Sequence, residues 1–190
     1  MRPRLDVFRS ALALASLLLL VTALPTSAHG GPPATTDHHL GPGDRLSLLK
    51  TYVATARFLN ITAAERAGYE ILRDAQQIAC IDNPGVGGMG IHYVKGDLVV
   101  DPAIDALKPE ALVYEPQRNG RLKLVAVEYV VLQSAWDATN TRKPKLFGQE
   151  FALVPAGNRY GLPPFYELHA WIWEFNPLGL FDDWNPRVRC

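Results

Sequence analysis

From residue 80 onward the chain consists of short apolar runs separated by turn residues, a pattern typical of antiparallel strands. We expect about five strands, in the segments 91–94, 111–115, 122–132, 146–154 and 164–175. An Asn119-Gly120 step between the second and third segments favours a tight hairpin. The glycine-rich stretch 81–90 is expected to be a loop, because glycine permits backbone turns that other residues avoid.

Two helices are expected before the strands. Asp44 can cap the first helix. Its apolar positions recur at helical spacing and are Leu46, Leu49, Val53 and Ala56. A Thr-x-x-Glu capping box at Thr62 and Glu65 begins a second helix, which runs to about residue 79. The predicted class is therefore α+β, with two N-terminal helices packed on a curved antiparallel sheet of about five strands.

The first 28 residues have the three parts of a cleavable signal peptide. Arg2, Arg4 and Arg9 precede an apolar run over 11–24, and small residues close the segment at 25–28. The run is shorter than the roughly 20 residues that span a bilayer. We expect export and cleavage rather than a retained anchor, which is the alternative.

The expected organisation has three parts. A signal peptide covers 1–28, a flexible Gly- and Pro-rich segment covers 29–43, and a single α+β domain covers 44–190. The mature protein is expected to be secreted or otherwise extracytoplasmic, without membrane insertion after cleavage.

The balance of charges argues against a nucleic-acid partner. The chain has 19 Lys and Arg against 19 Asp and Glu, and removal of residues 1–28 leaves the remainder slightly acidic. Phosphate backbones are normally bound by a basic surface. We therefore expect no DNA or RNA partner.

The two cysteines, Cys80 and Cys190, are predicted to form a disulfide. An oxidising compartment outside the cytoplasm favours their pairing. The bond would tie the C-terminus to the middle of the chain. Two free thiols or an intermolecular bridge are the alternatives.

Polar residues interrupt the apolar strand runs. His92 lies within Ile-His-Tyr-Val, Glu128 within Val-Ala-Val-Glu-Tyr-Val-Val, and His169 within Leu-His-Ala-Trp. A buried charge is costly unless it is paired or ligates a metal. Because side chains alternate along a strand, Glu167 and His169 share one face of the last strand. The other members of that face are Phe165, Trp171 and Trp173.

These residues predict a metal site if they converge. Two imidazoles and a carboxylate are ligands of many zinc and iron(II) sites in which a coordination position stays open. We therefore predict a divalent metal, zinc or iron, at His92, Glu128, Glu167 and His169. The prediction requires both histidines on one face of the sheet and less than about 10 Å apart, since ligands lie about 2 Å from a zinc ion.

Other roles for the same residues stay open at this stage. Without a metal, a histidine beside a glutamate makes an acid–base pair. A purely structural role is also compatible, on a solvated face or bonded to the hydroxyl of Tyr93 or Tyr129. The late aromatic residues are compatible with a pocket for an apolar or carbohydrate ligand.

Three hypotheses for the function follow. The first is a secreted small-molecule or metal-binding domain. The second is a metal-dependent extracytoplasmic enzyme that uses the same His and Glu residues. The third is a structural or interaction domain without a site.

Two further patterns carry less weight. The glycine-rich stretch precedes a predicted strand and lacks a following Lys-Ser/Thr pair, which argues against a phosphate-binding loop. Cleavage after residue 28 would expose His29, whose amine and imidazole can chelate copper, with His38 and His39 nearby. The irregular composition of the segment favours adventitious metal binding by these histidines.

Three motifs carry a resemblance to a known family. They are GGMGIHYV at 87–94, PEALVY at 109–114 and DWNP at 183–186. With these motifs the chain resembles a family of uncharacterised secreted bacterial proteins, over most of the predicted mature domain. The resemblance implies an extracytoplasmic location and brings no activity, cofactor or site residue with it.

Overall fold

The computed structural model describes residues 40–190, which belong to one folded unit of the α+β class. The predicted signal peptide and residues 29–39 of the predicted flexible segment, with His29, His38 and His39, lie outside the described residues. Within the described part, no helix is long and apolar enough to cross a membrane.

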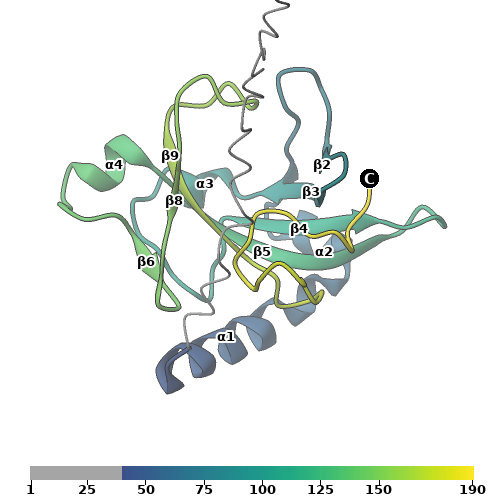
Figure 1. Cartoon of the computed structure of the whole chain (residues 1–190), viewed down its shortest axis with the longest axis horizontal. Helices are drawn as coiled ribbons and strands as arrows, with labels where there is room; N and C mark the ends of the chain where they lie inside the picture. Colours follow the sequence, from purple (N-terminus) through teal and green to yellow (C-terminus); the bar gives the residue numbers. More distant parts are fainter. Residues whose placement is uncertain (1–39) are drawn as a thin grey trace, which may run out of the picture. The chain divides into compact units, whose positions relative to one another are not determined.

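Most of the strands join one antiparallel sheet (Figure 1). The helical segments are α1 (Pro42–Thr55), the 3-10 helix η1 (Ala56–Leu59), α2 (Ile61–Arg66), α3 (Gly96–Val99) and α4 (Gln133–Asp137). The strands are β1 (Glu70–Ile71), β2 (Cys80–Asn83), β3 (Gly87–Val94), β4 (Ala111–Pro116), β5 (Leu122–Leu132), β6 (Lys145–Leu146), β7 (Gln149–Glu150), β8 (Ala152–Val154) and β9 (Phe165–Ala170). The order in the sheet is β1-β3-β4-β5-β9-β8, β2 also pairs with β3, and β6 and β7 form a separate ribbon.

The prediction of two helices on five strands is only partly right. The antiparallel sheet is confirmed, but it has seven strands. The N-terminal helical region is α1 continued directly by η1, and the second helix, α2, has only six residues. Helix α1 begins at Pro42, two residues before the predicted cap, because proline suits the first helical position.

Helix α2 ends at Arg66 instead of about residue 79 because Gly68 terminates it. Gly68 adopts a φ of +89°, and its N–H donates to the carbonyl of Glu65. The next N–H, of Tyr69, donates to the carbonyl of Ala64. These two bonds are the Schellman arrangement that closes a helix. The start also differs from the prediction, since the side chain of Asn60, not Thr62, caps the first turn.

The glycine-rich stretch is a hairpin rather than a loop. Strand β2 pairs with β3, and β3 begins at Gly87, four residues before the predicted strand. A Cβ on Gly88 would lie 2.8 Å from the carbonyl oxygen of Val188, and one on Gly90 would lie 2.7 Å from that of Tyr114. The glycines therefore let other backbone segments approach β3 closely.

The later strands match the prediction unevenly. Strand β5 has the predicted bounds, and β4 and β5 form the predicted hairpin. The predicted strand 146–154 is divided into β6, β7 and β8, because Phe147 and Gly148 both adopt positive φ and make a turn. Strand β9 ends at Ala170, five residues before the predicted end.

Helix α1 is rotated relative to the sequence-based expectation. Its buried residues are Leu48, Thr51 and Thr55. The hydroxyl of Thr51 donates to the carbonyl of Ala106, and the indole N–H of Trp173 donates to the hydroxyl of Thr55. These contacts turn the predicted apolar positions Leu46, Leu49 and Val53 toward solvent.

Alternation along β5, shifted once where Tyr114 pairs with Leu124 and Val113 with Ala126, gives the sheet two different faces. One face belongs to the larger apolar core, which includes residues of α1, η1 and α2. On β5 its members are Leu124, Val127, Tyr129 and Val131. The other face carries a smaller apolar cluster, made by Val113, Val125, Ala126, Trp171 and Val188. The last two belong to the segment after β9, so this segment covers the second face.

We call residues 171–190 the C-terminal strap. The predicted disulfide is confirmed, since Cys80 and Cys190 are bonded with their Cα atoms 5.5 Å apart. The backbones of Gly88 and Asn185 exchange two hydrogen bonds of 3.1 Å. The strap is therefore attached to β2 by a covalent bond and to β3 by a short bridge.

Substitution of Gly88 by alanine should loosen the strap. A Cβ there meets backbone atoms of Val188, and overpacking of this kind costs about 1–3 kcal/mol. Gly96→Ala is the matched control, because a Cβ there meets nothing within 4 Å. Urea unfolding measures both variants. Equal stability of the two variants would contradict the close approach of the Val188 backbone to Gly88.

Candidate metal centre

The register of the sheet brings the predicted site residues onto one face. Glu128 on β5 is paired with His169 on β9. His92 on β3 is paired with Val113 of β4, which is paired with Ala126 of β5. Ala126 and Glu128 lie two residues apart on β5, so all of these side chains point to the same side.

The two histidines and Glu128 converge on one face of the sheet. The Nε2 atoms of His92 and His169 are 3.4 Å apart, and His92 Nε2 is 3.4 Å from Glu128 Oε2. The three residues each offer one ligand atom, and these atoms all lie within 4.8 Å of one another. The requirement of one face and less than about 10 Å between the histidines is met.

Glu167 lies beside this group rather than in it. It is opposite Val130 on β5, two residues from His169 along β9. The β5–β9 register makes Glu167 a neighbour of Glu128, and its carboxyl group raises the pKa of Glu128. Glu167 is not one of the three residues whose ligand atoms converge. We therefore distinguish the His92–Glu128–His169 cluster from its neighbour Glu167.

Burial controls the protonation of the cluster. All four side chains are buried. Burial lowers the pKa of His92 to about 4, with a smaller effect from Arg159, and lowers the pKa of His169 to about 3, with a smaller effect from His92. Both imidazoles are therefore neutral at pH 7, the form that binds metals.

The acids shift in the opposite direction. Burial raises the pKa of Glu128 well above its usual range, and the charge of Glu167 adds to the shift. Burial raises the pKa of Glu167 to about 7, with a contribution from Asp183. A cation among these groups would favour the charged carboxylates.

The Nδ1 atoms of His92 and His169 are buried without a hydrogen-bond partner. Nδ1 of His169 lies 3.8 Å from Oδ1 of Asp183, which the C-terminal strap supplies. A carboxylate near the second ring nitrogen is the arrangement that orients metal-binding histidines. Sequence reasoning missed Asp183 as a site residue, although it lies in the DWNP motif.

Aromatic side chains border the cluster. Trp171 is stacked on His169, with ring centroids 6.1 Å apart, and Tyr160 approaches His92 edge-on at 6.5 Å. The prediction for Trp171 is confirmed. The prediction for Trp173 is wrong, because β9 ends at Ala170 and Trp173 instead stacks on Tyr52 of α1.

Tyr160 belongs to the loop between β8 and β9, and sequence reasoning missed it. The neighbouring Arg159 pairs with the buried Asp74 at 2.8 Å, and its carbonyl accepts a hydrogen bond from Ala75. These contacts join the loop to the segment between β1 and β2. No local motif marks this contact, because the partners are more than 80 residues apart.

The tyrosines considered as structural partners do not contact the cluster. The hydroxyl of Tyr129 donates to the carbonyl of Ala106, and Tyr93 packs edge-on against Tyr114. Both belong to the larger apolar core on the other face of the sheet. They therefore do not satisfy the histidines.

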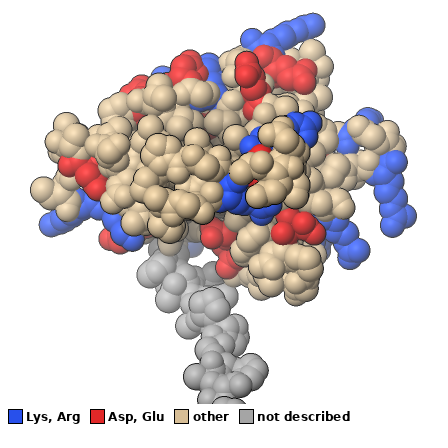
Figure 2. All heavy atoms as spheres, turned by 90° about the horizontal axis from the view of Figure 1, so that it is seen from above, with Lys and Arg blue, Asp and Glu red and all other residues tan. Residues whose placement is uncertain are grey.

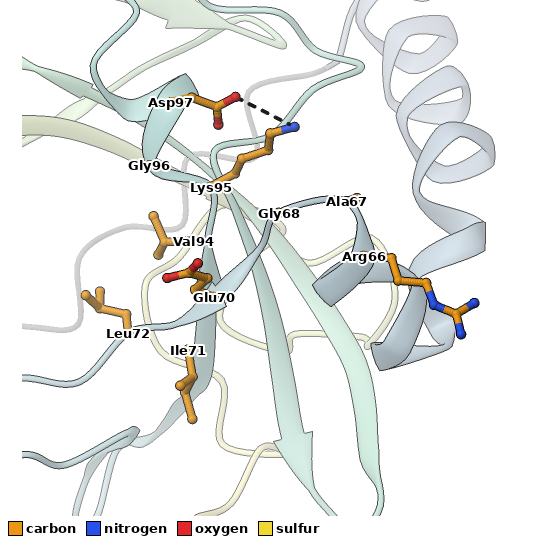
Figure 3. Close-up of a pocket in the computed structure, with 10 residues that line it drawn as sticks. All are labelled: Arg66, Ala67, Gly68, Glu70, Ile71, Leu72, Val94, Lys95, Gly96 and Asp97. Atoms are coloured by element: carbon orange, nitrogen blue, oxygen red, sulfur yellow. Dashed lines mark ion pairs between the residues drawn. The ribbon is translucent and has the colours of Figure 1, made fainter.

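An open groove lies elsewhere, along the edge strand β1 (Figure 3). Its volume is about 660 Å³, and none of the four predicted site residues lines it. Glu70, Lys95 and Asp97 are among its charged residues, and Lys95 Nζ lies 3.9 Å from Asp97 Oδ2. The groove has charges of both signs and offers no converging ligand set.

Surface charge is mixed on the face that Figure 2 shows. Acidic and basic side chains lie among uncharged residues on this face, rather than in one continuous basic area. This distribution agrees with the equal numbers of acidic and basic residues.

Comparison with known proteins assigns no family. No protein-family model matches the chain, and neither a curated protein nor a solved structure matches it. The case for a function therefore depends on the geometry of the cluster.

A further buried acid, Glu110 of the PEALVY motif, directly precedes β4. Its carboxylate accepts a hydrogen bond of 3.1 Å from the N–H of Val130. Burial raises the pKa of Glu110 to about 8; the hydrogen bond from Val130 opposes the shift, and Asp105 and Asp101 add to it. The folded state therefore favours the protonated acid.

Glu110→Gln should make the protein less sensitive to rising pH. With a folded-state pKa above the unfolded one, the stabilisation is fully present below about pH 4.5 and is lost as pH rises toward 8. Glutamine keeps the acceptor and stays neutral, so the variant should be more stable at pH 8 by about 2–4 kcal/mol. Urea unfolding from pH 4 to 8 measures this. The two proteins should coincide near pH 4, and parallel profiles would refute the assignment.

Proposed function

We propose that this chain is an exported metal-binding protein in which His92, His169 and Glu128 hold one divalent ion, zinc or iron. The observation that carries the proposal is the convergence of three ligand atoms: His92 Nε2 lies 3.4 Å from both His169 Nε2 and Glu128 Oε2, and the ligand atoms of the three residues all lie within 4.8 Å of one another. Neighbouring ligand atoms of a tetrahedral zinc ion lie about 3.3 Å apart, since each is about 2.0–2.1 Å from the metal.

The electrostatics of the site support a cation. Burial raises the pKa of Glu128 and of Glu167; Glu167 and Asp183 raise that of Glu128 further, and Asp183 raises that of Glu167. Burying ionised acids is costly without an opposite charge. The nearby cation Arg159 is already paired with Asp74. A bound divalent ion would offset the charge of the acids, and the neutral imidazoles are ready to ligate it.

Asp183 is proposed to orient His169. A histidine that ligates through Nε2 carries a proton on Nδ1, and that proton needs an acceptor. Asp183 is the carboxylate nearest to this atom, at 3.8 Å. Asp183 is then a positioning residue, held in place by the attached strap.

The proposal of export depends on the chain outside the site. The signal-peptide pattern of residues 1–28 and the resemblance to secreted bacterial proteins both favour it. The Cys80–Cys190 disulfide supports the same location, because such bonds persist in oxidising compartments.

A metal-dependent enzyme is the second candidate function. The observation that favours it is the number of ligands, since the described cluster supplies three residues, and catalytic zinc sites keep a position for water or substrate. Tyr160 lies beside His92 and Glu167 beside Glu128, so both would be near a metal held by the cluster. Turnover by the loaded protein would distinguish an enzyme from a metal carrier.

The His92–Glu128–His169 cluster should bind one metal ion per chain. Metal-free protein is titrated with Zn²⁺ and Co²⁺ against a chelator of known affinity. His169→Ala and His92→Ala should each weaken binding at least about 100-fold, because each removes a ligand. The double variant His38→Ala/His39→Ala is the control for histidines outside the cluster. Equal metal content in His169→Ala and the unmodified protein would exclude the site.

Asp183→Asn should weaken metal binding about 10–100-fold while the metal-free protein keeps its unfolding midpoint. Asp182→Asn is the matched control, because Asp182 accepts a bond from the N–H of Trp184 that asparagine can also accept. The visible spectrum of bound Co²⁺ should change only in the Asp183 variant. An unchanged affinity and spectrum would show that Asp183 does not orient His169.

A further inference from the structure

The outer side of α1 is a second apolar face. Leu46, Leu49 and Val53 are 52%, 58% and 66% exposed. Their spacing of three and four residues places them in one line along the helix. The inner side of the same helix already contributes Leu48, Thr51 and Thr55 to the buried part of the fold. The outer line is therefore not needed for folding of the described residues.

The exposed apolar residues of α1 form a continuous strip rather than a single isolated side chain. Leu59 of η1, which continues α1 directly, is also exposed, at 54%. Single exposed apolar residues are common on protein surfaces, whereas contiguous apolar strips mark contact with a protein or a membrane. We call Leu46, Leu49 and Val53 the outer stripe of α1.

Basic residues flank the outer stripe. At 100° per residue, Arg45 lies on one side of the stripe and Lys50 on the other, and Arg57 follows in η1. Among the described residues, none of these three basic side chains forms an ion pair. The acid of the first turn, Asp44, lies toward the half-buried side of the helix.

We propose that the outer stripe of α1 docks the protein on a lipid surface with anionic head groups. Leu46, Leu49 and Val53 would enter the boundary between head groups and acyl chains, and Arg45 and Lys50 would contact the phosphates. Helices that lie in the membrane plane have this combination of an apolar stripe and flanking cations. The contact is peripheral and requires no spanning helix.

The charges favour a lipid surface over a second copy of the chain. If two copies paired through their outer stripes, the flanks of both helices would bring basic residues together. The flanks themselves offer no acid to compensate them. Like charges in contact oppose association, whereas an anionic surface attracts the same residues.

Vesicle binding tests the proposal. The chain from residue 29 onward, which contains the whole described fold, is mixed with vesicles of phosphatidylcholine alone or with 40 mol% phosphatidylglycerol, and bound protein is measured by flotation. Binding is expected to the anionic vesicles and to fall as salt rises. Leu49→Ser/Val53→Ser should lower the partition coefficient at least about 10-fold.

Two variants separate the apolar and charged contributions. Arg45→Gln/Lys50→Gln should reduce binding to the anionic vesicles at least about 5-fold and weaken its salt dependence. Val100→Ser is the matched control, since Val100 is 66% exposed, like Val53, but lies outside α1, and it should bind as the unmodified protein does. Thermal unfolding shows that each variant is folded.

Three results would overturn the proposal. They are equal binding to both kinds of vesicle, binding that is indifferent to Leu49→Ser/Val53→Ser, and no binding at low salt. Sedimentation without lipid distinguishes the rival occupant. A dimer that dissociates in Leu49→Ser/Val53→Ser, without vesicle binding, would assign the outer stripe to a second copy.

Discussion

Strand β5 is paired with β4 on one edge and β9 on the other, and its alternating side chains create two faces that must both be covered. The apolar face is covered in part by the N-terminal helical region. The face with Glu128 is partly covered by the C-terminal strap and bordered by the loop of Tyr160. The packing of the helical region and of the strap depends on the register of β5. A slip of one residue would turn the side chains of each face to the other side of the sheet. The His92–Glu128–His169 cluster and the core are thus consequences of the same pairing.

The C-terminal strap both covers one face of the sheet and supplies a residue next to the His92–Glu128–His169 cluster. Its apolar residues Trp171 and Val188 pack on the sheet, and Asp183 reaches the second nitrogen of His169. The disulfide and the Gly88–Asn185 bridge hold this segment in place. Two of the resembling motifs, GGMGIHYV and DWNP, are therefore joined to each other beside the cluster. Two of their residues have a physical explanation: Gly88 leaves room for the backbone of Val188, and Asp183 lies near His169.

The sequence predicted those parts of the molecule that short-range patterns determine. The long, largely apolar run of β5 marked its bounds, and the polar residues inside apolar runs marked His92, Glu128 and His169. The orientation of α1 was not predictable, because Thr51 and Thr55 become buried only through bonds to Ala106 and Trp173. Asp183 and Tyr160 reach the site through loops whose path depends on the finished sheet. Glu167 has the right face but lies beside the converging ligands.

The cluster joins residues that are far apart in the chain, since His92 and His169 are separated by 77 positions. Contacts of this range carry a larger loop-closure entropy than the contacts within one hairpin. A chain that has closed the β4–β5 hairpin without adding β9 lacks one of the two imidazoles. An ion held by both imidazoles would therefore stabilise only molecules whose sheet is fully assembled, and partly folded chains would gain no stability from it.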